Sequence, residues 1–209
     1  MIKKTTEKVT EGILKAISAS QSGIANLEML DSLRLCSRGS LLATLCRLGK
    51  QKRIIRLKRG AYSTNPIQDG YAAAQVKFEG YIGFASALRL HGLITEEPFT
   101  ITIATSNLSR TAQIENMEFR AVALGKRAFG TVRIGRYEVS SKAKTLFDCL
   151  LLPHYSVPED VLEEAYSNAG MKSADWREFN DYAKKFGGRK TDIMLNFAKR
   201  IRGIKNGNA

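Results

Sequence analysis

The stretch from Lys50 to Ser63 constrains the fold of this 209-residue chain more than any other part of it. Apolar residues at positions 55 and 57 alternate with Arg56 and Lys58, which is the pattern of a half-buried strand. The dipeptide Arg59-Gly60 can form a turn, and Ala61–Thr64 can return as a second strand. The stretch therefore predicts a β-hairpin with a cationic tip.

Three helical segments precede this hairpin. The first presents Val9, Ile13 and Ile17 on one face, because these residues lie four positions apart. A short second helix is expected around Asn26–Leu33, and Ser37 can cap a third helix that continues to about residue 49. Three helices followed by a basic hairpin are the order of a winged helix-turn-helix domain. In such a domain the third helix enters the major groove and the hairpin lies on phosphates.

The third helix has a packing side and an open side when its residues are placed 100° apart. Leu41, Leu45 and Leu48 form the packing side, with Leu42 at its edge. The opposite side carries small, hydroxyl-bearing and cationic residues, which let a helix approach the groove floor and contact bases or phosphates. The residues expected to contact DNA are Arg38, Ser40, Thr44, Arg47 and Lys50 of this helix and Arg56, Lys58 and Arg59 of the hairpin.

The charge of the chain agrees with a polyanionic partner. Lys and Arg number 33 against 20 Asp and Glu, which gives a net charge of +13. Residues 1–70 hold 13 of these cations and 5 of the acids. Nucleic acid ranks first among the partners, ahead of an anionic membrane and an acidic protein. Duplex DNA is favoured over RNA or a protein-binding wing, and among the basic segments only Tyr62 is aromatic, which disfavours single-strand stacking.

A polar stretch at residues 63–70, which contains Pro66 and Gly70, separates two expected domains. Residues 1–66 form the expected winged helix-turn-helix domain and residues 71–205 the second domain. Periodicity predicts helices over 72–78 and 82–91, strands over 99–105, 117–124 and 131–139, and a run of helices from Ser140 onward. The chain is therefore expected to be α+β, with a small sheet and a helical tail in the second domain.

Three segments carry a resemblance to a known family: Arg56–Tyr62 at the hairpin, Tyr81–Leu93 at the start of the second domain, and Ser140–Leu150 followed by Pro153. In this order and spacing they resemble the AbiEi-type antitoxins of type IV toxin–antitoxin systems, over about residues 5–200. The resemblance implies a winged helix followed by an antitoxin domain. It places the basic DNA-binding residues at Arg38, Arg47, Arg56, Lys58 and Arg59, and assigns no residue to the antitoxin activity.

The resemblance also implies two activities and two partners. The first activity is repression of the protein's own operon through binding of double-stranded promoter DNA at inverted repeats. The second is neutralisation of a toxin with a nucleotidyltransferase fold, without a stable complex between toxin and antitoxin. Basic residues of the second domain can extend the DNA footprint or form an ordinary solvated surface; they are Arg89, Arg127, Arg133, Arg136, Lys142 and Lys144.

No arrangement of residues predicts an enzyme, and we expect no catalytic residue, metal or cofactor. His91 and His154 have neither a nucleophile nor metal-ligand spacing beside them. Asp148, in an apolar helix, is the one acidic position of interest. It is either a buried structural carboxylate or part of a functional groove. The cysteines Cys36, Cys46 and Cys149 are an odd, widely spaced set and are expected to be small buried residues.

Two alternatives to the antitoxin interpretation stay open. One is a winged-helix transcription factor whose second domain binds a ligand or dimerises, and the other is an unconventional enzyme, for example a kinase, that modifies the toxin. No apolar run approaches the roughly 18 residues that a spanning helix needs. No signal peptide is recognisable at the N-terminus, so a cytoplasmic protein is expected.

Overall fold

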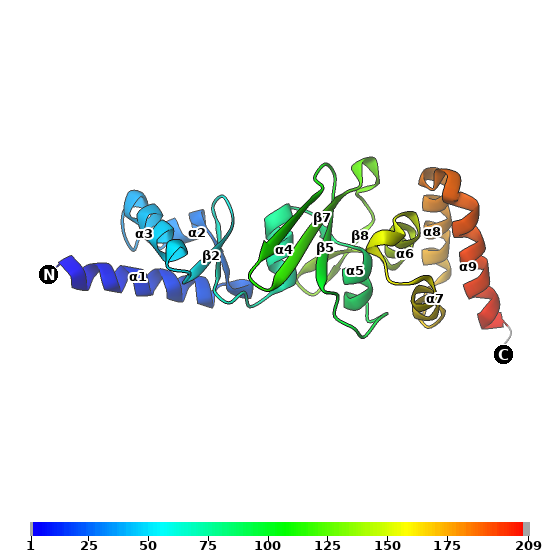
Figure 1. Ribbon diagram of the computed structural model, residues 1–209, viewed down its shortest axis with the longest axis horizontal. Coiled ribbons are helices and arrows are strands. Elements are labelled where there is room, and N and C mark those ends of the chain that lie inside the picture. The colour runs from blue at the N-terminus through cyan, green and yellow to red at the C-terminus, as the bar shows by residue number, and fades with distance from the viewer. Residues whose placement is uncertain (1, 207–209) are drawn as a thin grey trace. The chain divides into compact units, whose positions relative to one another are not determined.

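The computed structural model describes residues 2–206, and the protein is α+β. The chain divides into two compact units, Met1–Lys77 and Phe78–Ala209 (Figure 1). The division falls later than the expected linker at 63–70, because Ser63 and Thr64 belong to a strand and Gly70 begins a helix. None of the described helices has both the length and the apolar character needed to cross a bilayer.

The N-terminal unit combines helices with a small antiparallel sheet. Its three strands have the order β1-β3-β2, with Ala25 opposite Tyr62 and Ile55 opposite Ser63. Its elements are α1 (Ile2–Ala19), η1 (Gln21–Gly23), β1 (Ile24–Asn26), α2 (Leu27–Ser32), α3 (Arg38–Lys50), β2 (Ile54–Lys58), β3 (Ala61–Thr64) and α4 (Gly70–Phe78), the last of which runs to the boundary between the units.

Local sequence signals explain where the helices of this unit begin. The Asn26 side chain accepts a hydrogen bond from the backbone N–H of Met29 at 2.7 Å, so Asn26 caps α2. Ser37 caps α3 in the same way, as the sequence predicted, by accepting from the N–H of Ser40 at 3.3 Å. The helices and strands enclose one apolar core, whose buried members are Ile13, Ile17, Ala25, Leu30, Leu41, Leu45, Leu48, Ile54 and Tyr62.

The predicted basic hairpin is present, but its strand alternation differs from the expected one. The pairing of β2 with β3 shifts between Arg56 and Lys58, which leaves Leu57 as an extra residue, a β-bulge. Leu57 and Ile54 are buried, whereas Ile55 is only half-buried. Because of the bulge, the two buried residues of β2, Ile54 and Leu57, are separated by two residues and not by the one residue that strict alternation predicts.

The second unit is built on a mixed six-stranded sheet with the order β6-β7-β5-β4-β9-β8. Strand β5 is parallel to β7, and β4 is parallel to β9, with Ile82 opposite Val139; the other neighbours are antiparallel. The strands are β4 (Tyr81–Ile82), β5 (Thr100–Thr105), β6 (Arg110–Ile114), β7 (Met117–Ala123), β8 (Thr131–Ile134) and β9 (Tyr137–Ser140).

Three details of this sheet depart from the sequence prediction. The helix expected over 82–91 begins only at Phe84, because Tyr81–Ile82 is a strand that pairs on both edges. The single strand expected over 131–139 is a hairpin that turns at Gly135, whose φ of +56° favours glycine. Strand β6 was not predicted, because its alternation is limited to two apolar residues, Ala112 and Ile114, which are half-buried between exposed polar neighbours.

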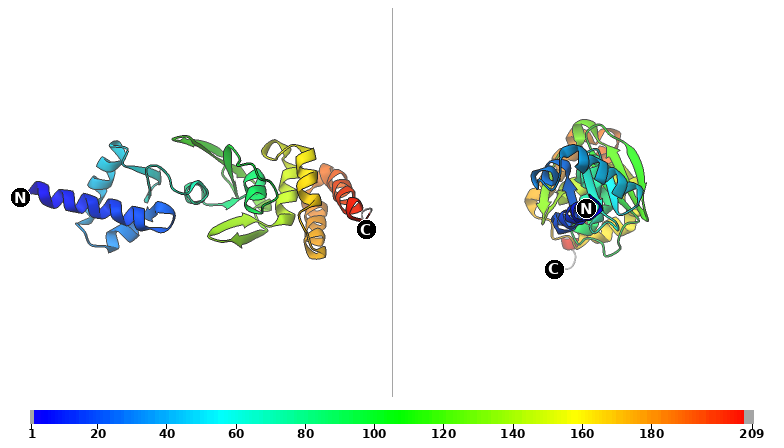
Figure 2. Two further views of the ribbon diagram at one scale, coloured as in Figure 1. Left: turned by 90° about the horizontal axis from the view of Figure 1, so that it is seen from below. Right: turned by 90° about the vertical axis from the view of Figure 1, so that its left-hand side faces the viewer.

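Helices gather on one side of this sheet, as the yellow to red elements in the left view of Figure 2 show. Helix α6 packs against α5 and α8, and α9 packs against α7 and α8. They bury large side chains such as Phe84, Phe147, Tyr166, Phe179 and Phe197 in one core with Tyr81 and Val122 of the sheet. The elements are α5 (Phe84–Leu90), η2 (Gly125–Arg127), α6 (Lys142–Leu151), η3 (Pro153–Tyr155), α7 (Glu159–Ser167), α8 (Ser173–Phe186), η4 (Gly188–Lys190) and α9 (Thr191–Asn206).

Candidate nucleic-acid interface

Helix α3 presents one face to the core of the N-terminal unit and the other to solvent. Leu41, Leu45 and Leu48 are buried at 2% exposure or less, as the helical phase predicted. Ser40, Arg47 and Lys50 are exposed, which also agrees with the predicted open side. The helix packs on strand β2, so the exposed face belongs to the same compact unit as the basic hairpin.

Two expectations about α3 are wrong: that Thr44 is open to DNA and that Cys46 is buried. Thr44 is only 8% exposed and lies on the buried side next to Leu48, so it is not placed to contact DNA. Leu42 lies at the edge of the packing side, as expected, and is 43% exposed. Cys46 is also exposed, contrary to the expectation that every cysteine is buried; Cys36 is half-buried and Cys149 is buried.

Part of the exposed face consists of residues that were not expected to contact DNA. These are Gly39, Leu42 and Cys46, together with Ala43. Counted at 100° per residue from the buried leucines, Ala43 and Lys50 lie nearest to directly opposite the core. Gly39 and Cys46 lie beside them, and Leu42 is about 90° from the leucines.

The three cations of α3 differ in their present partners. The Arg38 guanidinium is 2.6 Å from the Asp31 carboxylate, and both side chains are partly exposed. The Arg47 guanidinium donates to the Thr10 hydroxyl at 2.9 Å, which directs it toward α1. Lys50 ends the helix in solvent. An exposed ion pair such as that of Arg38 contributes little stability, so its exchange for a phosphate costs little.

The hairpin β2–β3 supplies the remaining expected residues. Arg56 and Arg59 are exposed, and Lys58 is half-buried. Gly60 completes the turn with a φ of +77°, a conformation that costs glycine little. Its carbonyl oxygen accepts a hydrogen bond from the N–H of Leu27 at 2.8 Å, which attaches the tip to the start of α2. The cationic tip is thus held by the fold rather than free to move as an open loop.

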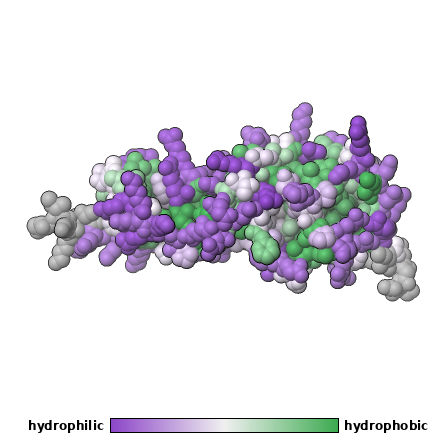
Figure 3. All heavy atoms as spheres, viewed as in Figure 1, coloured by the Kyte–Doolittle hydropathy of each residue, from purple (hydrophilic) through white to green (hydrophobic). Residues whose placement is uncertain are grey.

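The surface around these residues is predominantly hydrophilic. On the face that Figure 3 shows, hydrophilic side chains cover most of the N-terminal unit, and the apolar areas among them are smaller. The exposed large apolar side chains of this unit are Met29, Leu33, Leu35 and Leu42, at 37–44% exposure. Of these four, Leu42 is the one that lies on α3.

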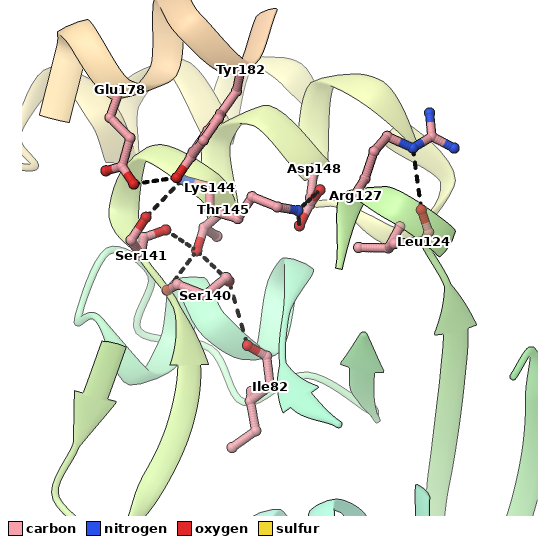
Figure 4. A network of polar contacts seen from close by, with 10 residues as sticks. All are labelled: Ile82, Leu124, Arg127, Ser140, Ser141, Lys144, Thr145, Asp148, Glu178 and Tyr182. Carbon is pink, nitrogen blue, oxygen red and sulfur yellow. Dashed lines mark hydrogen bonds and ion pairs between the residues drawn. The ribbon is translucent and has the colours of Figure 1, made fainter. Parts of the chain in front are cut away.

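The second unit contains a buried ion pair within helix α6. The Lys144 ammonium nitrogen Nζ lies 2.5 Å from each carboxylate oxygen of Asp148, and both side chains are 0% exposed (Figure 4). Nζ is also 5.3–5.9 Å from the ring centroids of Tyr81, Phe129 and Phe147. Asp148 is therefore a buried, fully paired carboxylate. Lys144 is not a surface cation, so the expectation that it could extend a DNA footprint is wrong.

Burial dominates the electrostatics of this pair. It raises the pKa of Asp148 to about 6, although Lys144 and then Arg127 oppose the shift. Burial also lowers the pKa of Lys144, against the attraction of Asp148. Around the pair, the Ser140 and Thr145 hydroxyls lie 2.7 Å apart, and the Tyr182 hydroxyl donates to Glu178 (Figure 4). Both carboxylate oxygens of Asp148 are occupied by Lys144, which indicates a structural role.

The other basic residues of the second unit that were expected to extend the DNA footprint differ in their contacts and in their exposure to solvent. Arg89 pairs with Glu97 at 3.0 Å, and the Lys142 ammonium donates to the Ala169 carbonyl at 2.7 Å. Arg127 is half-buried, whereas Arg133 and Arg136 are exposed on the β8–β9 hairpin. The last two are the members of this set that the fold leaves most open to solvent.

Two of the segments that carry the family resemblance meet in the core of the second unit. His91 ends α5, and its ring nitrogen Nε2 is 2.7 Å from the carbonyl oxygen of Ser140. Because a carbonyl only accepts, Nε2 carries the proton, and burial lowers the pKa of this imidazole. The Ser140 hydroxyl donates to the Ile82 carbonyl at 3.4 Å. The segments Tyr81–Leu93 and Ser140–Leu150 therefore stabilise each other.

Among the residues that the structure describes, no three His, Cys, Asp or Glu side chains gather closely enough to hold a metal ion. His154 lies exposed in η3 against the ring of Tyr155, whereas His91 is half-buried. Comparison with protein-family models and with curated proteins finds no match.

Proposed function

We propose that the N-terminal unit is a winged helix-turn-helix that binds double-stranded DNA, with α3 in the major groove and the β2–β3 hairpin on phosphates. The observation that carries the proposal is the combination of a solvent-facing α3 with a basic hairpin in one compact unit. A helix presented in this way can reach base edges, while a cationic strand pair beside it contacts the backbone.

The order of elements supports the same proposal. A long helix, a short strand, two helices and a hairpin follow one another, and the short strand completes the sheet beside the hairpin. The distribution of charge supports it further, since residues 1–70 carry 13 cations and 5 acids. A duplex that displaces Asp31 from Arg38 would gain an additional cation at the start of α3.

We extend the proposal to biological role on the basis of the family resemblance. The chain acts as an AbiEi-type antitoxin that represses its own operon through inverted repeats in the promoter and neutralises a nucleotidyltransferase-like toxin. What supports this second part is the three resembling segments alone. A transcription factor without antitoxin activity and an enzyme that modifies the toxin are the alternatives that the test below separates.

Binding to promoter DNA tests the first part. Fluorescence anisotropy of the full-length protein on a labelled duplex from upstream of its own gene should show saturable binding. If six cations contact phosphates, the slope of log K against log salt will be on the order of −5. Arg47→Ala should weaken specific binding by about 1–3 kcal/mol if this residue reads a base. Arg177→Ala, an exposed arginine on α8, is the matched control and should leave binding unchanged. Absence of binding to any duplex at low salt would refute the proposal.

Growth assays test the second part. The gene adjacent to this one is induced alone and together with the full-length protein. Rescue from toxicity supports the antitoxin role, and a triple alanine variant at Arg56, Lys58 and Arg59 should still rescue if neutralisation does not require DNA binding. Toxicity without rescue would leave the transcription-factor alternative. Rescue accompanied by a covalent mass change on the toxin would favour the enzyme.

A further inference from the structure

The exposed face of α3 has an unusual composition for a protein surface. Its exposed residues include the uncharged Gly39, Leu42, Ala43 and Cys46, beside Ser40 and Arg47. Leu42 is 43% exposed, and the Cys46 thiol faces solvent. Arg38 lies at the start of the helix, and Arg47 and Lys50 lie in its last turn. Between Arg38 and Arg47 the exposed side chains are small, hydroxyl-bearing or apolar.

Packing within the described chain does not account for these residues. A Cβ added at Gly39 would meet no atom within 4 Å, so no neighbour requires a glycine there. Glycine within a helix is less stable than alanine. Leu42 likewise leaves much of an apolar side chain in water. A partner that approaches α3 closely at Gly39 and covers Leu42 would explain why a glycine and an exposed leucine occur at these positions.

Because α3 lacks certain side chains, the bases that it can recognise are limited. The helix contains no Asn, Gln, Asp or Glu. Asn and Gln make the bidentate contacts that recognise adenine, and Asp and Glu accept from the amino group of cytosine. The groups that remain are apolar contacts, which suit the thymine methyl group, and Arg or Lys, which suit guanine.

From this composition we infer that α3 reads thymine methyl groups through Leu42, Ala43 and Cys46, and guanine through Arg47 and Lys50. The inference rests on the proposed function, because it requires α3 to lie in the major groove of a duplex. Residues 39–46 span about 10 Å along the helix axis at 1.5 Å per residue, which corresponds to about three base pairs. Each half-site should therefore contain two or three thymines beside a guanine.

Deoxyuridine, which lacks the thymine methyl group, tests the inference without altering the protein. The full-length protein first selects its preferred sequence from a random duplex library. Each thymine in the selected site is then replaced by deoxyuridine, and Kd is measured by anisotropy. Loss of one buried methyl group should weaken binding about fourfold, from about 0.8 kcal/mol per buried carbon. Replacing the guanine by 7-deazaguanine, which removes one acceptor, should weaken it as well.

A pair of leucine variants assigns the effect to α3. Leu42→Ala should abolish the sensitivity to deoxyuridine at one thymine, because the apolar partner is gone. Leu33→Ala is a matched control, since Leu33 is 44% exposed but lies outside α3, and the deoxyuridine effect should remain about fourfold. Both side chains are largely solvent-accessible, and circular dichroism confirms that each variant is folded.

The possible results distinguish a failure of thymine recognition by α3 from a failure of the proposed DNA-binding function. A selected site that binds equally well with thymine and deoxyuridine would overturn the inference while leaving DNA binding intact. Deoxyuridine sensitivity that is unchanged in Leu42→Ala but lost in Leu33→Ala would also overturn it. Failure to select or bind any duplex would refute the proposed function itself.

Discussion

Replacing Lys144 with methionine isolates the energetic role of the buried ion pair in α6. Methionine retains an unbranched side chain of similar length but removes the ammonium group. Asp148 then loses the cation that contacts both of its oxygens, in surroundings where both residues are 0% exposed. A buried carboxylate without such a partner takes up a proton rather than keep its charge.

The size of the effect follows from the free energy needed to keep Asp148 protonated in the folded state. The ordinary pKa of the group is 3.8. At 1.36 kcal/mol per pH unit, keeping the carboxyl protonated in the folded state costs about 4 kcal/mol at pH 7 and about 2 kcal/mol at pH 5. The wild-type protein, in which burial already raises the pKa of Asp148 to about 6, bears part of this cost, so the loss caused by the substitution is smaller than these totals and grows from pH 5 to pH 7. Because the folded-state pKa of Asp148 is raised above its unfolded value, the stability of the variant falls as pH rises above about 4.

Urea unfolding followed by tryptophan fluorescence measures this difference in the second unit alone. Trp176 is the one tryptophan of the chain and lies buried in α8. Lys172→Met, at an exposed lysine, is the control and should change the free energy of unfolding by less than about 0.5 kcal/mol. The double variant Lys144→Met with Asp148→Leu should recover most of the loss, since an apolar pair needs no counter-charge. An equal loss at pH 5 and pH 7 would refute the reasoning.

Three further predictions concern the N-terminal unit. Gly39→Ala should raise the free energy of unfolding by up to about 1 kcal/mol, because the added methyl group meets no atom, and it should weaken duplex binding. Urea unfolding measures the first effect and fluorescence anisotropy the second. An unchanged free energy of unfolding would contradict the first expectation. Combined Arg56→Ala and Lys58→Ala should reduce the salt slope of DNA binding by about 2, and an unchanged slope would remove the hairpin from the phosphate contacts. Cys46 should react with a thiol reagent in the folded protein, whereas burial raises the pKa of the Cys149 thiol to about 12 and should protect it. Mass spectrometry of labelled peptides should show slower labelling of Cys46 when duplex DNA is present, and equal rates would place α3 outside the interface.

Local signals made much of the N-terminal unit predictable. Ser37 and the leucines spaced along α3 determined both the start and the buried side of that helix, and Gly60 marked the turn of the hairpin. The placement of Thr44 failed because a threonine was judged by its hydroxyl group instead of its angle. The bulge at Leu57 was not predictable, because it depends on pairing with a strand and not on the local pattern.

In the second unit the errors arise from contacts between distant segments. The local pattern predicts that Ile82 begins a helix, whereas in the structure it lies in β4, which pairs with β5 on one edge and β9 on the other. A lysine is rarely buried, so Lys144 was treated as a surface residue. Its spacing of four positions from Asp148, within an otherwise apolar helix, was the one signal in the sequence that could have revealed the pair.

The position of β4 also determines the order in which the two units can be completed during synthesis. Ile82 pairs with Val139, so the sheet of the second unit stays open until about 60 further residues have been made. At about 5–20 residues per second the ribosome needs about 3–12 s for this stretch. The strands of the N-terminal unit all lie within residues 24–64 and are available before then. A nascent chain therefore passes through a stage of several seconds in which α3 and its hairpin are complete while the second unit still lacks the strand that closes its sheet.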